Sequence, residues 1–312
     1  MSDANLVLIA APVHPVLTEG LEALGYRLRL APDIRPEDAG ALLQDCVGVI
    51  TSTRIQLSRP LLAQHPQLRW IGRMGSGMEV IDTAAAAEMG VAVFASPEGN
   101  CNAVAEHALG MLLALTNKIA ASAAEVTQGK WLREENRGAE LEGKTIGLIG
   151  FGHTGRAFAR LLRGFEVEVL AYDPYISGNF PANVAQVALD ALQARADVIS
   201  FHVPIGPDTR HYFDEAFLEA LQKPVYLINT ARGEVVNSEV LEKGLVSGKV
   251  RAAALDVWEG EPLPRMPTVE RERLLRLSVL PQVLITPHIA GYSYEALYKM
   301  SATLLSKLKA FL

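Results

Sequence analysis

Three side chains in the second half of the sequence have types suited to proton transfer and to the binding of a carboxylate. They are Arg232 in Asn-Thr-Ala-Arg-Gly-Glu, Glu261 in Asp-Val-Trp-Glu-Gly-Glu-Pro and His288 in Thr-Pro-His-Ile-Ala-Gly. A histidine with a pKa near neutrality can take a proton from a hydroxyl group and return it. A carboxylate on its second ring nitrogen fixes the tautomer, and a guanidinium binds a planar carboxylate at two points. Taken singly, each residue also has a structural interpretation: a salt-bridge arginine, a loop acid and a core histidine.

A second pattern, Gly150-Phe-Gly152-His-Thr-Gly155, follows directly on an apolar run, Thr145 to Ile149, that predicts a buried strand. Helical apolar spacing comes next. A further predicted strand, Val167 to Tyr172, then ends in Asp173. Strand, glycine loop, helix, strand and terminal acid together are typical of a dinucleotide-binding unit, whereas glycines alone would mark only a turn.

Each glycine of this loop has a mechanical reason. Gly150 permits a tight turn, Gly152 lets backbone approach a pyrophosphate, and Gly155 lets helix and strand pack closely. The unpaired N–H groups that open the helix, at His153 and Thr154, suit phosphate. Asp173 can accept both hydroxyls of an adenosine ribose and would repel a 2′-phosphate, so the predicted cofactor is NAD.

The size and composition favour a two-domain globular protein that is predicted to be cytoplasmic. The chain has 312 residues, 49% of them hydrophobic, and a net charge of −6. The acidic balance, without a long basic run, argues against nucleic acid. Cys46 and Cys101 lack metal-ligand spacing and are expected to be reduced thiols, so we predict no metal site. Charged and polar residues interrupt the most apolar stretch, Ala103 to Ala124, which predicts a buried helix and not a membrane span.

Strands and helices alternate along the chain, which predicts α/β architecture with two doubly wound parallel sheets. The first predicted unit lacks the glycine fingerprint. We expect a flavodoxin-like substrate (catalytic) domain of residues 1–99 and 291–312, into which a Rossmann NAD-binding domain of residues 100–290 is inserted. The catalytic candidates would stand at carboxyl ends of strands.

Four segments carry specific structural expectations. Pro97 to Asn100 reads as a turn-rich break, and one long helix is expected from about Asn102 to Gln128. Pro262 to Val279 is a charged insert without a clear prediction. The amphipathic segment Ser293 to Leu312 predicts a final helix that packs on the first domain.

At these residues the sequence resembles the D-isomer-specific 2-hydroxyacid dehydrogenase family over nearly its whole length. The motifs that carry the resemblance are Gly75-Ser-Gly77 with Ile81-Asp82, Ala103-Val-Ala-Glu-His107, Gly150–Gly155, His202-Val-Pro204, Asn229–Gly233, Ala254-Leu-Asp-Val257, Glu261-Pro262 and Pro287-His-Ile289.

The resemblance implies Arg232, Glu261 and His288 as the catalytic set, Arg232 and His288 also contacting substrate. It implies substrate contacts from Ser76 and Gly77 and a homodimer formed through the helix after the break. Further residues would lie along the cofactor: Val104, Pro204, Thr209, Thr230, Ala231, Asp256 and Gly291. His107, His202 and His211 receive no catalytic role.

Within the family the chain is most similar to the phosphoglycerate dehydrogenase subgroup without a regulatory domain. That subgroup usually carries Arg-Ser after the third strand, where this chain has Ser52-Thr53 followed by Arg54. Thr53 and Arg54 are therefore the candidates for contact with a substrate phosphate. His153 stands where the glycine loop often has arginine.

The sequence thus predicts an NAD-dependent oxidoreductase that interconverts a small D-2-hydroxy acid and its 2-oxo acid. The leading candidate pair is 3-phosphoglycerate and phosphohydroxypyruvate. The alternatives are a glyoxylate/hydroxypyruvate reductase and a non-enzymatic NAD(H)-sensing binding protein.

Overall fold

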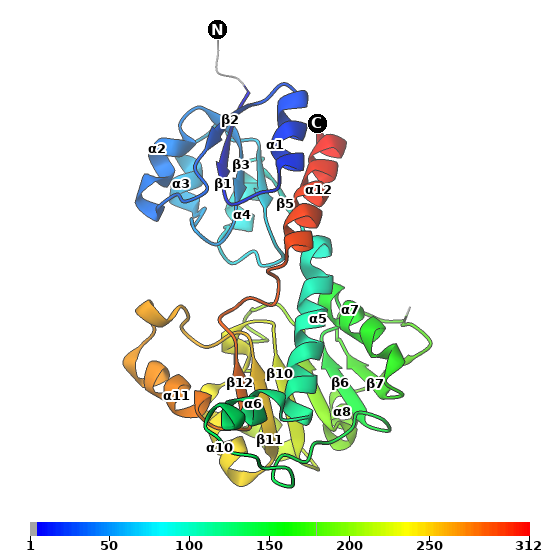
Figure 1. The fold of residues 1–312 in the computed structure, drawn as a ribbon. Helices are drawn as coiled ribbons and strands as arrows, with labels where there is room; N and C mark the ends of the chain where they lie inside the picture. Colours follow the sequence, from blue (N-terminus) through cyan, green and yellow to red (C-terminus); the bar gives the residue numbers. More distant parts are fainter. Residues whose placement is uncertain (1–4, 179) are drawn as a thin grey trace. The chain divides into compact units, whose positions relative to one another are not determined.

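The computed structural model describes residues 5–178 and 180–312, and the chain folds into two compact units (Figure 1). One unit comprises the chain as far as Cys101 together with Tyr292–Leu312, and the other is Asn102–Gly291. Each unit is built around its own parallel sheet.

The first unit contains a five-stranded parallel sheet in the order β2-β1-β3-β4-β5. This is the flavodoxin-like order, as predicted. The strands are β1 (Leu6–Ala10), β2 (Arg27–Leu30), β3 (Cys46–Thr51), β4 (Trp70–Arg73) and β5 (Ala92–Ala95).

Alternation along β1 places apolar side chains on both faces of this sheet. Leu6, Leu8 and Ala10 pack in one core cluster, and Val7 and Ile9 pack in another. The first cluster lies under α2 (Ala39–Leu43), α3 (Arg59–Ala63) and α4 (Thr83–Glu88), and the second under α1 (Pro15–Ala23) and α12 (Tyr294–Phe311). The final helix therefore completes the first unit, as expected from its amphipathic pattern.

The second unit contains a seven-stranded parallel sheet in the order β12-β11-β10-β9-β6-β7-β8. The strands are β6 (Thr145–Ile149), β7 (Glu168–Tyr172), β8 (Val184–Gln186), β9 (Val198–Phe201), β10 (Val225–Asn229), β11 (Val250–Leu255) and β12 (Val283–Ile285). The strand order reverses at β6, because β7 and β8 follow on one side of it and β9 to β12 on the other. The switch point of the sheet therefore lies where the glycine loop follows β6.

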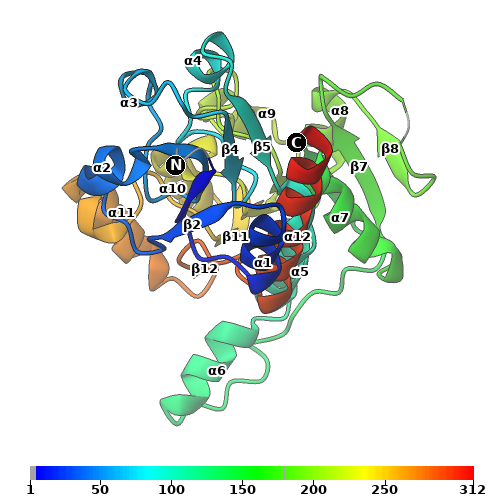
Figure 2. The same ribbon diagram turned by 90° about the horizontal axis from the view of Figure 1, so that it is seen from above.

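Helices pack around this sheet, and aromatic side chains form part of its core. Phe201, Phe213 and Phe217 pack in that core. The helices of this unit are α5 (Pro97–Thr116), which begins in the first unit, α6 (Ile119–Thr127), α7 (His153–Leu161), α8 (Leu189–Arg195), α9 (Glu215–Ala220), α10 (Ser238–Ser247) and α11 (Thr268–Ser278). α6 has no buried residue and extends away from the sheet (Figure 2). β8 and α8 were not anticipated from the sequence.

The predicted single helix from Asn102 to Gln128 is wrong, because it breaks into α5 and α6 with a bend of 61°. Lys118 adopts a left-handed conformation with φ +52°. The loop that follows α6 supplies the cause: Ala139 N donates to Thr116 O at 2.8 Å, and Lys118 Nζ reaches Glu135 O at 2.5 Å. The first bond occupies the Thr116 carbonyl, which a continuing helix would use, and the second ties the Lys118 side chain to the same loop.

The predicted break at Pro97 to Asn100 is also wrong, since these residues form the first turn of α5. Proline suits the first helical position, and Glu98 favours the positive end of the helix dipole. The Pro262 to Val279 insert, left without a prediction, contains a short 3₁₀ turn, Leu263–Arg265, and then α11.

Within the described ranges 5–178 and 180–312, no single helix has the length and apolar character needed to cross a membrane. Only the bent α5–α6 pair meets that criterion, by length and composition.

Candidate active site

The carboxyl edge of the seven-stranded sheet carries most of the predicted site residues. Each follows a strand: the glycine loop follows β6, Asp173 follows β7, and Arg232 follows β10. Asp256 and Glu261 follow β11, and His288 follows β12. Parallel strands bring these segments to one edge, which is where ligands bind in such sheets.

The glycine loop has the backbone geometry that the sequence predicts. Gly150 has φ +92°, and a Cβ there would lie 2.6 Å from His202 O. A Cβ on Gly155 would lie 2.4 Å from Gly150 O, so helix and turn touch directly. A Cβ on Gly152 would meet no atom of the described chain within 4 Å. Two glycines are therefore required by the chain itself, whereas Gly152 leaves space for a ligand.

The residues around this loop fit a dinucleotide. No side chain caps α7, which begins at His153 and Thr154, so its first N–H groups can bind phosphate. Asp173 accepts hydrogen bonds from Phe151 N at 2.8 Å and Tyr175 N at 2.9 Å, which places its carboxylate beside the glycine loop. The Thr230 hydroxyl is buried without a hydrogen-bond partner in the described part of the chain, as a residue that meets a polar ligand would be.

His288 and Glu261 form a hydrogen-bonded pair through His288 Nδ1 and Glu261 Oε1. A carboxylate only accepts, so Nδ1 carries the proton. The hydrogen bond to Glu261 raises the pKa of His288 above its ordinary value, while burial and the positive charge of Arg232 oppose that rise. The His288 side chain is still 45% exposed. It is therefore a reachable imidazole whose protonated form is stabilised.

The backbone that presents His288 is held by Asp256. The Asp256 carboxylate is 1% exposed and accepts hydrogen bonds from Ile289 N at 2.9 Å and Ala290 N at 2.7 Å. It also accepts from the Thr286 hydroxyl at 2.5 Å. His288 N donates to Asp256 O at 2.7 Å. The predicted cofactor contact of Asp256 would add to these bonds.

His107, which the sequence analysis left without a catalytic role, completes this network from α5. Its Nε2 lies 3.0 Å from the Thr286 hydroxyl and 3.5 Å from Asp256 Oδ1. The histidine thus braces the segment that carries His288.

Arg232 stands in a turn organised by the fully buried Asn229. The Asn229 side chain accepts from Ala231 N at 3.0 Å and donates to Arg232 O at 2.8 Å. Arg232 Nη1 donates to Ala231 O at 2.7 Å. The positive charge of Arg232 lowers the pKa of His288, and Glu261 raises it, so the three predicted catalytic residues lie close enough to interact electrostatically.

The other predicted cofactor residues lie on three further segments. The Thr209 hydroxyl donates to Pro204 O at 2.6 Å in the loop after β9. Val104 is a buried residue of α5, and Gly291 is the last residue of the second unit.

The remaining substrate candidates belong to the first unit, where they follow neighbouring strands. Thr53 and Arg54 are exposed after β3, and Ser76 and Gly77 follow β4. The Arg54 guanidinium lies 3.2 Å from the Asp33 carboxylate. The Ser96 hydroxyl accepts from Gly75 N at 3.0 Å and so fixes the start of the Ser76 loop.

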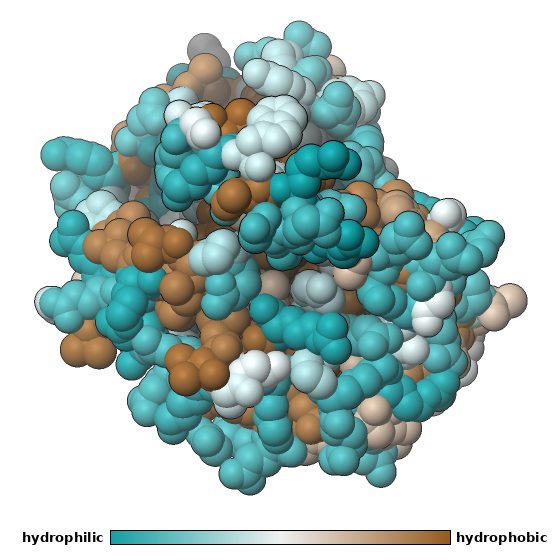
Figure 3. Space-filling view, turned by 60° about the horizontal axis from the view of Figure 1, so that its bottom comes forward, coloured by the Kyte–Doolittle hydropathy of each residue, from teal (hydrophilic) through white to brown (hydrophobic). Residues whose placement is uncertain are grey.

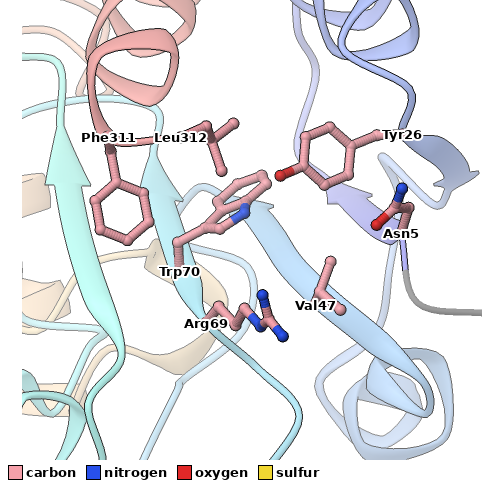
Figure 4. Close-up of a pocket in the computed structure, with 7 residues that line it drawn as sticks. All are labelled: Asn5, Tyr26, Val47, Arg69, Trp70, Phe311 and Leu312. Atoms are coloured by element: carbon pink, nitrogen blue, oxygen red, sulfur yellow. The ribbon is translucent and has the colours of Figure 1, made fainter.

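A pocket of about 260 Å³ lies at the opposite, amino-terminal edge of the first sheet (Figure 4). The Trp70 indole nitrogen is buried there without a hydrogen-bond partner among the described residues. Five of its lining residues precede or begin strands and two end α12, so this pocket is separate from the Ser76 loop, which follows a strand. The lining residues are Asn5, Tyr26, Val47, Arg69, Trp70, Phe311 and Leu312.

Sequence reasoning missed the set formed by Glu259, His211 and Asn237, which ties three loops at this edge. No motif marked it, because its members are far apart in the chain and meet only through loop conformation. Among the described residues, no cluster of three or more His, Cys, Asp or Glu side chains could hold a metal ion.

Residues 109–290 match the family described as "D-isomer specific 2-hydroxyacid dehydrogenase, NAD binding domain". The chain is 31% identical over 304 residues to a D-3-phosphoglycerate dehydrogenase of Methanocaldococcus jannaschii, covering 96% of this chain and 56% of that protein. It is 36% identical over 264 residues to a hydroxypyruvate reductase of Thermotoga maritima, covering 85% of this chain and 83% of that protein. The chain thus spans about half the length of the phosphoglycerate dehydrogenases that it matches.

The fold is similar to a crystal structure of D-lactate dehydrogenase from Aquifex aeolicus complexed with NAD and lactic acid. The TM-score is 0.85 at 28% identity, with 98% of this chain and 95% of that chain covered. The predicted fold class and NAD cofactor are confirmed. The chain belongs to the D-isomer specific 2-hydroxyacid dehydrogenase family, and residues 109–290 are its NAD-binding domain.

Proposed function

We propose that the protein is an NAD-dependent oxidoreductase that acts on the CH–OH group of a small D-2-hydroxy acid, or on the matching 2-oxo acid. The observation that carries the proposal is the His288–Glu261 pair at the carboxyl edge of an NAD-binding sheet, with the Arg232 charge acting on it. Family membership supports the same assignment.

His288 is the proton-transfer residue in this proposal. Its Nδ1–H is held by Glu261, so Nε2 is the atom that exchanges a proton with the substrate oxygen. Glu261 stabilises the imidazolium, which suits His288 to protonate the oxygen of a 2-oxo acid. NAD, when bound, supplies the hydride acceptor or donor at C2 of the substrate.

Arg232 binds the substrate carboxylate. A guanidinium offers paired N–H donors that match a planar carboxylate, and it keeps its charge at any working pH. The Ser76 and Gly77 backbone supplies further contacts to that group. We assign substrate binding chiefly to residues 1–99 and 291–312, and NAD binding to residues 100–290.

Two substrates of this class are the leading candidates. Phosphohydroxypyruvate, with 3-phosphoglycerate as its reduced partner, has the support of similarity to phosphoglycerate dehydrogenases. Hydroxypyruvate or glyoxylate has the support of the Arg54–Asp33 ion pair, because a guanidinium already paired at 3.2 Å binds phosphate less well. Similarity to a hydroxypyruvate reductase, of which the chain covers 83%, agrees with this second candidate.

A substrate panel with NADH tests both the proposed substrate class and the choice between these two candidates. Phosphohydroxypyruvate, hydroxypyruvate and glyoxylate are offered to the wild type and to Arg54→Ala. If the phosphate binds Arg54, the variant raises KM for phosphohydroxypyruvate about ten-fold or more and leaves KM for hydroxypyruvate unchanged. Absence of NADH oxidation with every acid would favour the NAD(H)-sensing alternative.

His288→Ala tests the catalytic assignment. General acid–base catalysis contributes about 10²–10⁴-fold, so kcat should fall by at least about a hundred-fold while NADH still binds. Normal turnover in this variant would refute the role of His288.

We also propose a cytoplasmic homodimer. Both cysteines are free thiols, which suits a reducing compartment. α6 and the loop after it expose Ile119, Val126 and Trp131, with Trp131 78% exposed. Apolar side chains also lie among hydrophilic ones on the face seen in Figure 3. Light scattering of the wild type and of Trp131→Ser tests the dimer, and a monomeric wild type would contradict it.

A further inference from the structure

The loop that carries Glu261 is fastened by a second acid, Glu259. The Glu259 side chain is 16% exposed. Its Oε1 receives a hydrogen bond from His211 Nε2 at 2.5 Å, and its Oε2 receives one from Ser238 N at 2.8 Å. Both oxygens are therefore engaged, one by the loop after β9 and the other by the first turn of α10.

The surrounding bonds fix the tautomer of His211. Asn237 Oδ1 accepts from the backbone N–H groups of Glu239 and Val240, so the Nδ2 of Asn237 is a donor and faces His211 Nδ1 at 3.4 Å. His211 Nδ1 must then accept a hydrogen bond, and Nε2 carries the hydrogen that it donates to the Glu259 carboxylate.

The same set joins the Arg232 segment to the Glu261 loop. His211 N donates to Glu234 O at 2.6 Å, two residues beyond Arg232. A Cβ on Gly233 would lie 2.1 Å from the backbone carbonyl carbon of Trp258, so the two segments are in direct backbone contact. A displacement of the Trp258–Glu259 backbone would therefore also displace Gly233 and the adjoining Arg232.

The orientation of Glu261 depends on this backbone as well. Its Oε2 accepts from Trp258 N at 3.2 Å, while its Oε1 binds His288. Glu259 lies between Trp258 and Glu261 in the chain, and its side chain bonds this loop to His211 and to Ser238 N. Loss of its two bonds releases the peptide groups that aim Glu261 at His288.

We propose that Glu259 is a positioning residue for the acid–base pair: with His211 and Ser238 N, it locks the Trp258–Glu261 loop so that Glu261 faces His288 and the Arg232 segment stays in register. The proposal rests on the proposed function only in giving this pair a catalytic task. The geometry itself concerns how His288 and Glu261 meet.

The test compares Glu259→Gln and His211→Asn with Glu239→Gln. Glutamine keeps the size of Glu259 and removes its charge. Asparagine tolerates the left-handed backbone of His211, at φ +52°, but is too short to reach Glu259. Glu239 is the matched control, a 63% exposed acid on the first turn of α10 that pairs with Lys243.

The first readout is the NMR titration of the His288 ring in the full-length protein. We expect both test variants to lower the pKa of His288 in the direction that Glu261→Gln does, and the control to leave it unchanged. The second readout is kinetic: kcat falls about ten-fold or more in the test variants, with little change in KM for NADH, because only alignment is lost.

The outcomes separate the two proposals. If the wild type turns over no acid but the His288 titration shifts as stated, the positioning role stands and the proposed function fails. If the wild type is active and both test variants titrate and turn over like Glu239→Gln, the positioning role is overturned. If the test variants only melt at a lower temperature, with a normal His288 titration and a normal kcat, then Glu259 only stabilises the fold. That result also overturns the positioning role.

Discussion

Two glycines three residues apart should fail in different ways when a methyl group is added. A Cβ on Gly155 would lie 2.4 Å from Gly150 O, where neither atom can move without opening the turn against α7. Overpacking of this kind costs about 1–3 kcal/mol. For a unit of this size the corresponding fall in melting temperature is roughly 2–12 °C.

Gly152→Ala adds its methyl group where no atom of the described chain lies within 4 Å, and the backbone φ of −76° lies outside the left-handed region that favours glycine. Its stability should stay within about 0.5 kcal/mol of wild type. Its affinity for NADH should fall about ten-fold or more, because the methyl group occupies the path by which backbone approaches the pyrophosphate.

Thermal unfolding and fluorescence titration with NADH measure the two effects on the same samples. Gly164→Ala is the control, since a Cβ there meets nothing within 4 Å and the residue lies beyond the carboxyl end of α7, whereas the glycine loop precedes its amino end. The reasoning fails if Gly152→Ala binds NADH like the wild type, or if it melts as early as Gly155→Ala.

Two further predictions concern charge at the same edge. The pKa of His288 is raised by Glu261, so the pair contributes stability below the unfolded histidine pKa of about 6.5, and that contribution is lost as pH rises through the folded value. Reduction of a 2-oxo acid needs the imidazolium, so its rate should fall over the same rise in pH, and Glu261→Gln should move that limb of the pH–rate profile to lower pH; an unmoved limb would contradict the pairing. Asp173→Asn removes the charge beside the glycine loop but keeps an acceptor for Phe151 N, so NADPH should gain affinity relative to NADH, and unchanged discrimination in competition binding would argue against a ribose contact.

Local constraints explain which features could be predicted from the sequence. The turn at Gly150 and the close contact at Gly155 each depend on a few neighbouring residues, so the order strand, loop and helix was sufficient to predict them. The helix break at Lys118 could not be predicted, because neither Asn117 nor Lys118 is a strong helix breaker. The break is imposed by a distant loop whose Ala139 N takes the Thr116 carbonyl.

In the candidate site too, some features could be predicted from the sequence and others depend on loop conformation. Arg232, Glu261 and His288 could be placed because each follows a strand, and parallel strands bring their ends to one edge whatever their loops do. The bonds that aim these side chains come from loop conformation: Asp256 holds the backbone after His288, and Glu259 holds the loop before Glu261. The family resemblance marked Asp256 only as a cofactor contact, and no motif marked Glu259, because their bonds to the chain arise from loop conformation. Acids that position a catalytic pair are therefore found from hydrogen bonds between loops, and their mutation should change the protonation of His288 before it changes binding of the cofactor.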